Sequence, residues 1–394
     1  MRKLLPILLL LIALAGCSAQ SAEESPGRVT FAPIPSPVVQ TRDVPTPTPT
    51  PPPTPEPTPN PSARIQMAGD ILLHGGLIRS AKVGETYDFK PYWAEIKPYI
   101  DGDLSICNME GPVDTFGGNA NISTYPRFNS PLEILDALKY AGFDALVTAN
   151  NHAYDRAFDG LVKNRENIEN AGFYVTGTNA TQEQYDEYLI RDVNGLKVGL
   201  IAYSEIDNGL GSLIPQDKRG FAMRRFDIGE ADVEKMAADM AECRRQGADM
   251  IILSLHWGVE YANKPGAAAV TMARALAENG ADVVMGNHSH CVQPVEWTET
   301  TRGKRLIIYS LGNFFVDQNA LNPPVPKTQY GMLVTVGAEL DKGELKLSAD
   351  YLPTFMRKYT VNGARKYMLL PAKEDDELTK AAYEHVTNIA GKIN

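Results

Sequence analysis

The stretch Asp282-Val283-Val284-Met285-Gly286-Asn287-His288-Ser289-His290 runs from an apolar segment into two histidines. Residues 282–285 predict a buried strand, which Gly286 ends. Two imidazoles two positions apart at the end of a strand project from the same side of the chain, as a pair of metal ligands does. This stretch therefore predicts a strand of the central sheet and a metal site at its carboxyl end.

Four more predicted strands end in polar side chains. They are residues 64–72 with Asp70, 103–109 with Glu110 next, 144–148 followed by Asn151 and His152, and 250–254 followed by His256. In open α/β sheets, ligands bind just outside the carboxyl ends of the strands, so these side chains are expected to converge. Carboxylate, amide and imidazole ligands together suit Mn, Zn or Fe better than Ca²⁺. The sequence thus predicts a site for one or two divalent transition metals.

Taken singly, these residues have simpler interpretations. Gly69-Asp70 can form an ordinary turn, Asn151 can cap a helix, and His256 can be a buried core histidine. The joint pattern favours metal binding, because four of the six histidines follow predicted strands. The other two are interpreted as solvent-exposed or packing residues: His74 in a Gly-rich turn and His385 on a terminal helix.

Helices and hairpins are predicted between and after these strands. The helices are residues 91–100, 131–141, 159–171, 229–246, 267–279 and 376–393, and the turns Asn194-Gly195 and Asp341-Lys342-Gly343 predict hairpins. Strand–helix alternation with interspersed hairpins indicates an α/β fold with a mixed sheet. Because no internal boundary is visible, residues 63–370 are expected to form a single large domain, followed by a C-terminal helix at 371–394.

The N-terminus has the features of an export signal. Arg2 and Lys3 precede an apolar run at 4–14, which is too short to span a membrane but has the length of a signal-peptide core. The sequence Leu14-Ala15-Gly16-Cys17 resembles the lipobox of bacterial lipoproteins. Residues 1–16 are therefore expected to be a signal peptide, and Cys17 to be lipidated and anchored to the membrane. An ordinary secretory signal is the alternative.

Residues 17–62 predict a disordered tether that follows the lipidated Cys17. Thr and Pro alternate through much of this segment, and proline prevents both helix and sheet hydrogen bonding. A polyproline II arm rises about 3.1 Å per residue, so this segment could hold a domain on the order of 100 Å from its anchor. The expected location is therefore extracytoplasmic, as a lipoprotein.

Composition and missing motifs exclude several classes of protein. The 394 residues include 38 Lys and Arg against 48 Asp and Glu, a net charge of −10, so a nucleic acid is not an expected partner. Four cysteines are too few for a disulfide scaffold in a chain of this length. The sequence has no P-loop, no dinucleotide fingerprint and no Gly-x-Ser-x-Gly elbow.

Six motifs in order resemble a known family. They are Gly69-Asp70, Asn108-Met109-Glu110, Asn150-Asn151-His152-x-x-Asp155, His256-Trp257-Gly258-x-Glu260-Tyr261, Gly286-x-His288-x-His290 and Tyr309-Ser310-Leu311-Gly312-Asn313-Phe314. This pattern is similar to the CapA-type capsule-synthesis family (PGA_cap), which is associated with poly-γ-glutamate capsules. The resemblance implies a fold like that of the calcineurin-like metallophosphoesterases, with layered mixed β-sheets flanked by helices.

The resemblance also implies roles for individual residues. Six of them are metal ligands: Asp70, which bridges two ions, with Glu110, Asn151, His256, His288 and His290. It implies that His152 protonates the leaving group, and that Asp155 orients a histidine ring. Arg127 matches a basic position that binds an anion, although it can equally be a surface arginine, and Asn313 is expected to line the pocket. The chain departs from the metallophosphoesterase pattern at Leu72, where a histidine is usual, and at Glu110, where an aspartate is usual.

Two functions of different classes follow from this resemblance. The first is a membrane-anchored, metal-dependent hydrolase of phosphoester type that acts on a phosphoester or on an anionic envelope polymer. The second is a non-catalytic factor for capsule assembly or export, which binds poly-γ-glutamate or the capsule synthase subunits. Leu72 favours the second function because a metal ligand is missing there. The Asn151-His152 pair favours the first.

Overall fold

Strands that are buried on both faces form the centre of the structure. The computed structural model describes residues 60–114, 116–318 and 326–393, so the expected signal peptide, Cys17 and nearly all of the expected tether lie outside the described residues. In β9 (Met250–His256), Met250 and Ile252 face one hydrophobic cluster, whereas Ile251 and Leu253 face another. Burial on both faces explains why this segment reads as an unbroken apolar run.

The first of two large sheets has eight strands. They are β1 (Ser62–Leu72), β4 (Leu104–Met109), β5 (Ala145–Val147), β6 (Tyr174–Thr176), β13 (Asn313–Val316), β14 (Tyr330–Asp341), β15 (Glu344–Val361) and β16 (Ala364–Pro371). Their order is β16-β15-β14-β1-β4-β5-β6, with β13 also paired to β1. Strand β1 pairs in parallel with β4 and antiparallel with β14, so the sheet is mixed.

The second sheet has six strands, with β9 near its middle. The others are β7 (Leu189–Val193), β8 (Leu196–Ser204), β10 (Val283–Asn287), β11 (Val295–Thr300) and β12 (Gly303–Ile308), in the order β11-β12-β10-β9-β8-β7. The four inner strands are parallel, and the two edge strands are antiparallel to their neighbours. A separate small hairpin joins β2 (Lys82–Val83) to β3 (Thr86–Tyr87).

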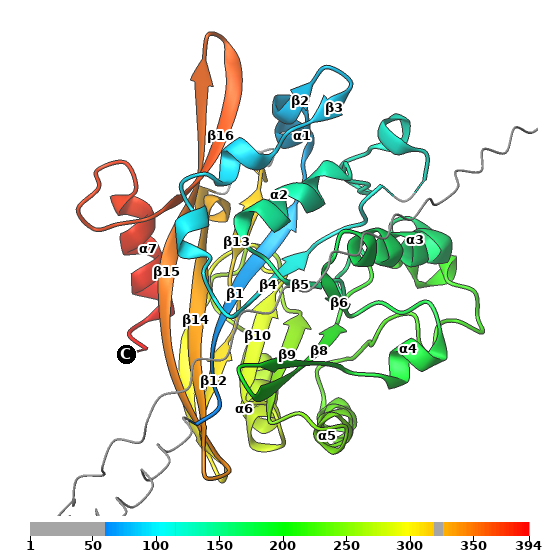
Figure 1. Ribbon diagram of the computed structural model, residues 1–394, viewed down its shortest axis with the longest axis vertical. Helices are drawn as coiled ribbons and strands as arrows, with labels where there is room; N and C mark the ends of the chain where they lie inside the picture. Colours follow the sequence, from blue (N-terminus) through cyan, green and yellow to red (C-terminus); the bar gives the residue numbers. More distant parts are fainter. Residues whose placement is uncertain (1–59, 115, 319–325, 394) are drawn as a thin grey trace, which may run out of the picture. The chain divides into compact units, whose positions relative to one another are not determined.

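Helices flank the two sheets (Figure 1). They are α1 (Gly75–Ala81), α2 (Glu133–Ala141), α3 (Ala157–Asn170), α4 (Gln182–Asp186), α5 (Glu230–Arg245), α6 (Ala267–Glu278) and α7 (Lys380–Ala390). Helices α1 and α2 share a hydrophobic cluster with the first sheet, and α5 and α6 share one with the second. A third cluster contains side chains of both sheets. No helix within residues 60–114, 116–318 and 326–393 is both long and apolar enough to cross a bilayer.

These layers confirm the predicted α/β class, with mixed sheets flanked by helices in a single domain. The Asn194-Gly195 turn joins β7 to β8, and residues 341–343 lie at the turn between β14 and β15, as the sequence predicts. Gly142 closes α2 in the left-handed conformation, with φ of 111°. Helix α7 packs into the cluster that contains both sheets, through Val386 and Ala390.

Three predictions about individual elements are wrong. Residues 91–100 form two short 3₁₀ turns, Lys90–Trp93 and Lys97–Tyr99, because Pro98 has no N–H with which to continue a helix. The last helix begins at Lys380 instead of residue 376. Strand β15 continues to Val361, ten residues past its predicted end, and β16 follows it. The Asn362-Gly363 turn, a strong hairpin signal, could have identified β16.

Two glycines let the backbone approach closely beside the strand ends. A Cβ atom on Gly69 would lie 1.9 Å from the carbonyl oxygen of Gly312, and one on Gly286 would lie 2.0 Å from that of Tyr309. The pairings of β1 with β4 and with β13 both shift register next to Asp70. Such bulges re-aim side chains beside functional sites. Here the irregularity lies where the polar side chains converge.

Asp282 connects the start of β10 to its neighbours. Its buried carboxylate accepts hydrogen bonds from the backbone N–H of Ile251 at 2.7 Å and from Arg244 at 2.6 Å. Arg305 lies 2.9 Å away, and Arg302 completes the cluster. One carboxylate therefore compensates three guanidinium groups beneath the second sheet.

Replacing Asp282 with alanine should destabilise the fold, because it leaves these guanidinium groups without their counter-charge. We expect the free energy of unfolding to fall by about 3 kcal/mol or more, as when one partner of a buried ion pair is removed. Urea unfolding followed by circular dichroism measures this. The control is Glu299→Ala, which removes an exposed carboxylate 4.0 Å from Lys304 and should cost less than about 1 kcal/mol. Equal losses in the two variants would contradict this account of Asp282.

Candidate metal centre

The structure brings together all six predicted ligands at the carboxyl ends of five strands. Asp70 lies in β1, Glu110 follows β4, Asn151 follows β5, His256 ends β9, and His288 and His290 follow β10. All six side chains are buried. The first three come from the first sheet and offer oxygen atoms, whereas the last three come from the second sheet and offer nitrogen atoms. The cluster therefore lies between the two sheets.

The nitrogen ligands and Asn151 face one another at short range. His256 Nε2 lies 2.9 Å from Asn151 Oδ1 and 3.1 Å from His288 Nδ1. A single ring nitrogen cannot donate to both of these atoms. Adjacent ligand atoms around a cation with bonds of about 2.1 Å are about 3 Å apart at right angles, so these spacings fit shared coordination.

The carboxylates are buried without enough hydrogen-bond donors. Asp70 Oδ1 accepts from Asn108 at 2.7 Å and Asp70 Oδ2 lies 3.2 Å from His290 Nδ1, whereas neither oxygen of Glu110 accepts a hydrogen bond from the described residues. Leaving buried carboxylate oxygens unpaired is costly unless a cation compensates them. The orphaned oxygens and the mixed oxygen and nitrogen donors therefore fit a divalent transition metal.

Two groups of side chains are close enough to hold one ion each. The first comprises Glu110, His256 and His288, and the second comprises Asp70, Glu110 and His290; in each, the ligand atoms lie within 4.8 Å of one another. Glu110 belongs to both groups, whereas the family resemblance implies Asp70 as the bridging carboxylate. This arrangement places the shared carboxylate at the position where the chain departs from the usual aspartate.

Burial and neighbouring charges set the protonation of the cluster. Burial raises the pKa of Glu110 well above its usual value, and Asp70 raises it further. Burial and then His290 lower the pKa of His288 to about 3, and burial and then His288 lower that of His256. Burial alone would lower the pKa of His290, but Glu110 and Asp70 raise it to about 9. Without a metal, His290 thus supplies the local positive charge, while the lone pairs of His256 and His288 are available to a cation.

The turn after β10 holds its two histidines in an unusual backbone conformation. His288 and His290 have φ angles of 91° and 56°, in the left-handed region that residues other than glycine rarely occupy. The Ser289 hydroxyl donates to the carbonyl oxygen of Cys291 at 2.7 Å and holds the turn between them. Such conformations cost on the order of 1–3 kcal/mol each and are concentrated at functional sites.

His152 lies beside the cluster with one ring nitrogen held in place. Its Nδ1 is 2.9 Å from Asp155 Oδ2, which also accepts the backbone N–H of Phe128 at 2.6 Å. The ring of Phe128 packs edge-on against the His152 ring, with centroids 4.7 Å apart. The guanidinium of Arg127 donates to the backbone carbonyl of Asp155 at 2.8 Å. Because Nδ1 is engaged, Nε2 is the nitrogen that His152 can present to a ligand.

A cavity of about 560 Å³ opens beside the cluster. Asn151, His152 and His290 form part of its wall, and Arg127 and Glu260 lie at its edge. Asn313 does not line this cavity. Instead, Asn313 holds the ring of His290, because its Oδ1 lies 2.9 Å from His290 Nδ1. Its amide nitrogen donates to Gln318 at 2.9 Å.

The cavity wall also contains a histidine that is not among the predicted site residues. His74, interpreted from sequence as a solvent or packing residue, is partly buried, lines the cavity and packs 5.3 Å from the Phe128 ring. Its Nδ1 is buried and has no hydrogen-bond partner among the described residues. Leu72, at the position of the usual histidine, lies in a small hydrophobic cluster with Phe128. His74 comes two residues after Leu72, and alternate residues of an extended chain share a face, which is the signal that could have identified it.

Curated proteins of similar sequence are named for the synthesis of a capsule, of PGA or of polyglutamine. The chain is 26% identical over 257 residues to "Capsule biosynthesis protein CapA" of Bacillus anthracis, covering 64% of this chain and 59% of that protein. It is 27% identical over 214 residues to "PGA biosynthesis protein CapA" of Bacillus subtilis, covering 54% and 52%. A probable polyglutamine synthesis accessory protein of Mycobacterium tuberculosis is 30% identical over 245 residues, covering 59% and 62%. The chain thus spans between about half and three-fifths of the length of these relatives.

A solved structure and a family model complete the comparison. A crystal structure of a Thermus thermophilus protein aligns with 73% of this chain at a TM-score of 0.36 and 10% identity. The family model described as "Bacterial capsule synthesis protein PGA_cap" matches residues 64–318, a range that contains all six ligands as well as His152 and Asp155. That range is well over half of the chain, and the protein therefore belongs to the PGA_cap family of bacterial capsule synthesis proteins.

Proposed function

We propose that this protein is a metal-dependent hydrolase of phosphoester type that acts in the synthesis of an anionic envelope polymer. The observation that carries the proposal is the His152–Asp155 pair, whose histidine lies on the wall of the same cavity as Asn151 and His290. A cluster that only bound metal for stability would not require a histidine with an oriented ring on the wall of the adjoining cavity. The names of the capsule-synthesis relatives support the polymer context.

The chain supplies three parts of such a reaction. Asp70, Glu110, Asn151 and the three histidines would hold a divalent metal, which when bound supplies charge neutralisation and Lewis acidity at a phosphoryl oxygen. Asp155 fixes the ring of His152 through Nδ1, so that Nε2–H can deliver a proton to the departing oxygen. Arg127 holds the backbone of Asp155 and lies at the edge of the cavity, where its positive charge favours an anionic substrate.

A second candidate function is a non-catalytic capsule-assembly factor that binds the polymer or its synthase. The observation that favours it is Leu72, which puts an apolar side chain where the metallophosphoesterase pattern has a histidine. The two functions differ in turnover, because an assembly factor would bind metal and polymer without cleaving any bond.

Metal content tests the cluster. The double variant His288→Ala/His290→Ala removes a nitrogen ligand from each of the two groups, so elemental analysis of the purified protein should find the transition metal lost. The matched control is His385→Ala, which removes an imidazole from α7, where the ring packs against Tyr330. The control should keep the metal content of the parent. Unchanged metal in the folded double variant would show that these histidines are not ligands.

Turnover of phosphodiesters tests His152 as the acid. His152→Asn should keep metal content and fold, but lower turnover of a diester with a poor leaving group by roughly 10²–10⁴-fold, the contribution of a positioned acid–base group. A nitrophenyl ester should be less affected, because its leaving group departs without a proton. Asp155→Asn should show a milder form of the same pattern.

The same assay separates the two candidate functions. If the metal-loaded parent turned over none of a broad panel of phosphoesters while still binding polyglutamate, the assembly factor would replace the hydrolase. An equal loss for good and poor leaving groups in His152→Asn would contradict the acid role but would leave a hydrolase possible.

We also propose that the chain is an extracytoplasmic lipoprotein anchored through Cys17, on the basis of the sequence Leu14-Ala15-Gly16-Cys17. Cys17→Ser should abolish incorporation of a labelled fatty acid and release the protein from the membrane fraction, because a stable anchor needs the acyl chains. Cys243→Ser, at a buried thiol of the domain, is the control and should stay labelled. Persistent labelling of Cys17→Ser would exclude this anchor.

A further inference from the structure

A second cavity adjoins the one at the candidate metal centre. Its volume is about 530 Å³, and it lies between α1, the loop at Thr124 and Tyr125, and the hairpin of β15 and β16. His74 and Tyr125 line both cavities. The hairpin extends beyond the end of the first sheet near α1 (Figure 1), so its outer part forms one wall of the second cavity.

The second cavity is positively charged, although the chain carries a net charge of −10. Arg79, Lys358 and Arg365 line it with one carboxylate, Asp317, so the charges of the lining side chains are three positive and one negative, a sum of +2. Within the part of the chain that the structure describes, only Lys358 of these three cations is paired with a carboxylate. Arg79 and Arg365 are exposed and keep their charge for a ligand.

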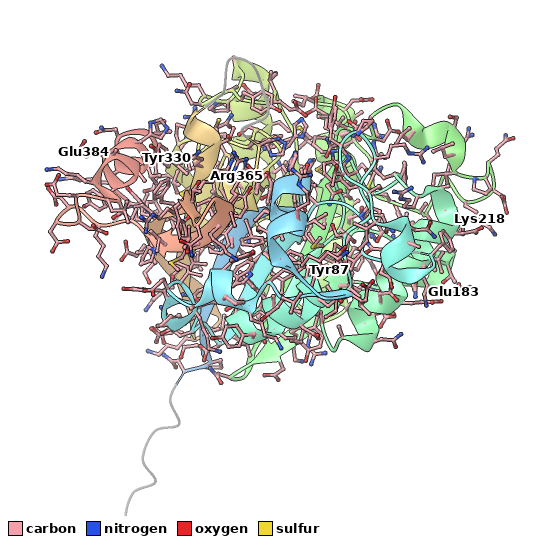
Figure 2. The ribbon with its side chains drawn as sticks, turned by 90° about the horizontal axis from the view of Figure 1, so that it is seen from above. Tyr87, Glu183, Lys218, Tyr330, Arg365 and Glu384 are labelled. Atoms are coloured by element: carbon pink, nitrogen blue, oxygen red, sulfur yellow. The ribbon has the colours of Figure 1, made fainter. Side chains whose placement is uncertain are left out.

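A buried network holds Lys358 in place and packs against the start of α1. Asp317 is buried and accepts from the Tyr367 hydroxyl and from Lys358, which ties β16 and β15 to the residue after β13. A Cβ atom on Gly76 would lie 2.2 Å from Asp317 Oδ2 and 2.4 Å from the Tyr367 hydroxyl, so the start of α1 packs directly on this network. Arg79 of α1 and Arg365 of β16 line the same cavity. Arg365 is labelled in Figure 2.

The two cavities share part of their lining, so an extended ligand could reach from one to the other. Tyr125, which is 76% exposed, and His74 line both cavities. A molecule with one group at the candidate metal centre can thus place a neighbouring group beside Arg79 and Arg365. Guanidinium groups bind carboxylate and phosphate oxygens with matched, forked hydrogen bonds.

We infer that the cavity of Arg79, Lys358 and Arg365 binds a second anionic group of the substrate, a carboxylate or a phosphate, while the first occupies the candidate metal centre. The substrate class is then an extended polyanion instead of a small monoester. This inference rests on the proposed function for the identity of the first group, but the binding of anions in the second cavity does not depend on turnover. A local positive cavity also explains how an acidic protein could bind a polyanion.

Direct binding tests the inference without any enzymatic step. Fluorescence anisotropy would measure the affinity of the parent for a labelled glutamate oligomer and, separately, a labelled polyphosphate at low ionic strength. Arg79→Gln/Arg365→Gln should weaken binding of at least one probe by about tenfold or more, because charge-assisted hydrogen bonds are lost. The affinity of this double variant for the probe should also fall less steeply with rising salt concentration than that of the parent. The probe that shows the larger loss identifies the anion, carboxylate or phosphate.

The control removes the same net charge from elsewhere on the surface. Lys342→Gln/Lys366→Gln changes two lysines that do not line the second cavity, one on the β14–β15 turn and one on β16 next to Arg365. Binding should weaken less than about threefold, the effect of the overall field alone. Equal losses in the two double variants, or no loss in either, would overturn the inference. A parent without phosphoester turnover would contradict the hydrolase proposal and leave this binding result intact.

Discussion

The carboxylate of Glu110 is buried between the two sheets, and neither of its oxygens accepts a hydrogen bond from the described residues. His256 Nε2 lies 3.7 Å from one oxygen and His290 Nδ1 lies 3.9 Å from the other. With Asp70 close enough to raise its pKa further, this charge needs a positive partner at the centre of the cluster. The glycines at the strand ends and the left-handed turn after β10 serve this requirement, because they bring nitrogen ligands to the carboxylates.

The candidate metal ligands are divided between the two sheets, so the cation that the Glu110 carboxylate needs would also affect how the sheets are joined. Oxygen ligands come from the first sheet and nitrogen ligands from the second, so a cation at the centre would join the two sheets as well as the ligands. Groups held on strand ends are positioned more rigidly than groups on loops. His152 and Arg127, in contrast, lie on connecting segments beside the cavity, where the Asp155 carboxylate and backbone carbonyl hold them. The candidate metal ligands thus lie in the strands or in the segments that directly follow them, and the residues proposed to meet the substrate lie beside them on the connecting segments.

Much of this arrangement could be predicted from the sequence, because apolar runs followed by polar residues mark the strand ends of an α/β fold. The six candidate ligands were identified in this way, and the β7–β8 and β14–β15 hairpins were predicted from the glycines of their turns. The role of Asn313 as a support for His290 could not be predicted, since it depends on a contact between segments far apart in the chain. His74 was missed although it follows Leu72 by two residues. Strand β16 was missed although Asn362-Gly363 marks its turn. The basic second cavity could not be predicted from the sequence, because most of the domain's sequence lies between Arg79 and Arg365.

The central claim is that the cluster around Glu110 binds a divalent transition metal. Equilibrium titration of the chelator-treated protein with Mn²⁺, Zn²⁺ and Fe²⁺, followed by calorimetry, measures this directly. The account predicts saturable binding of one or two ions per chain, since two groups of ligands share Glu110. It also predicts a higher unfolding temperature in the loaded protein, because a ligand that binds only the folded state stabilises it. A correctly folded protein that binds none of the three ions saturably would contradict the account.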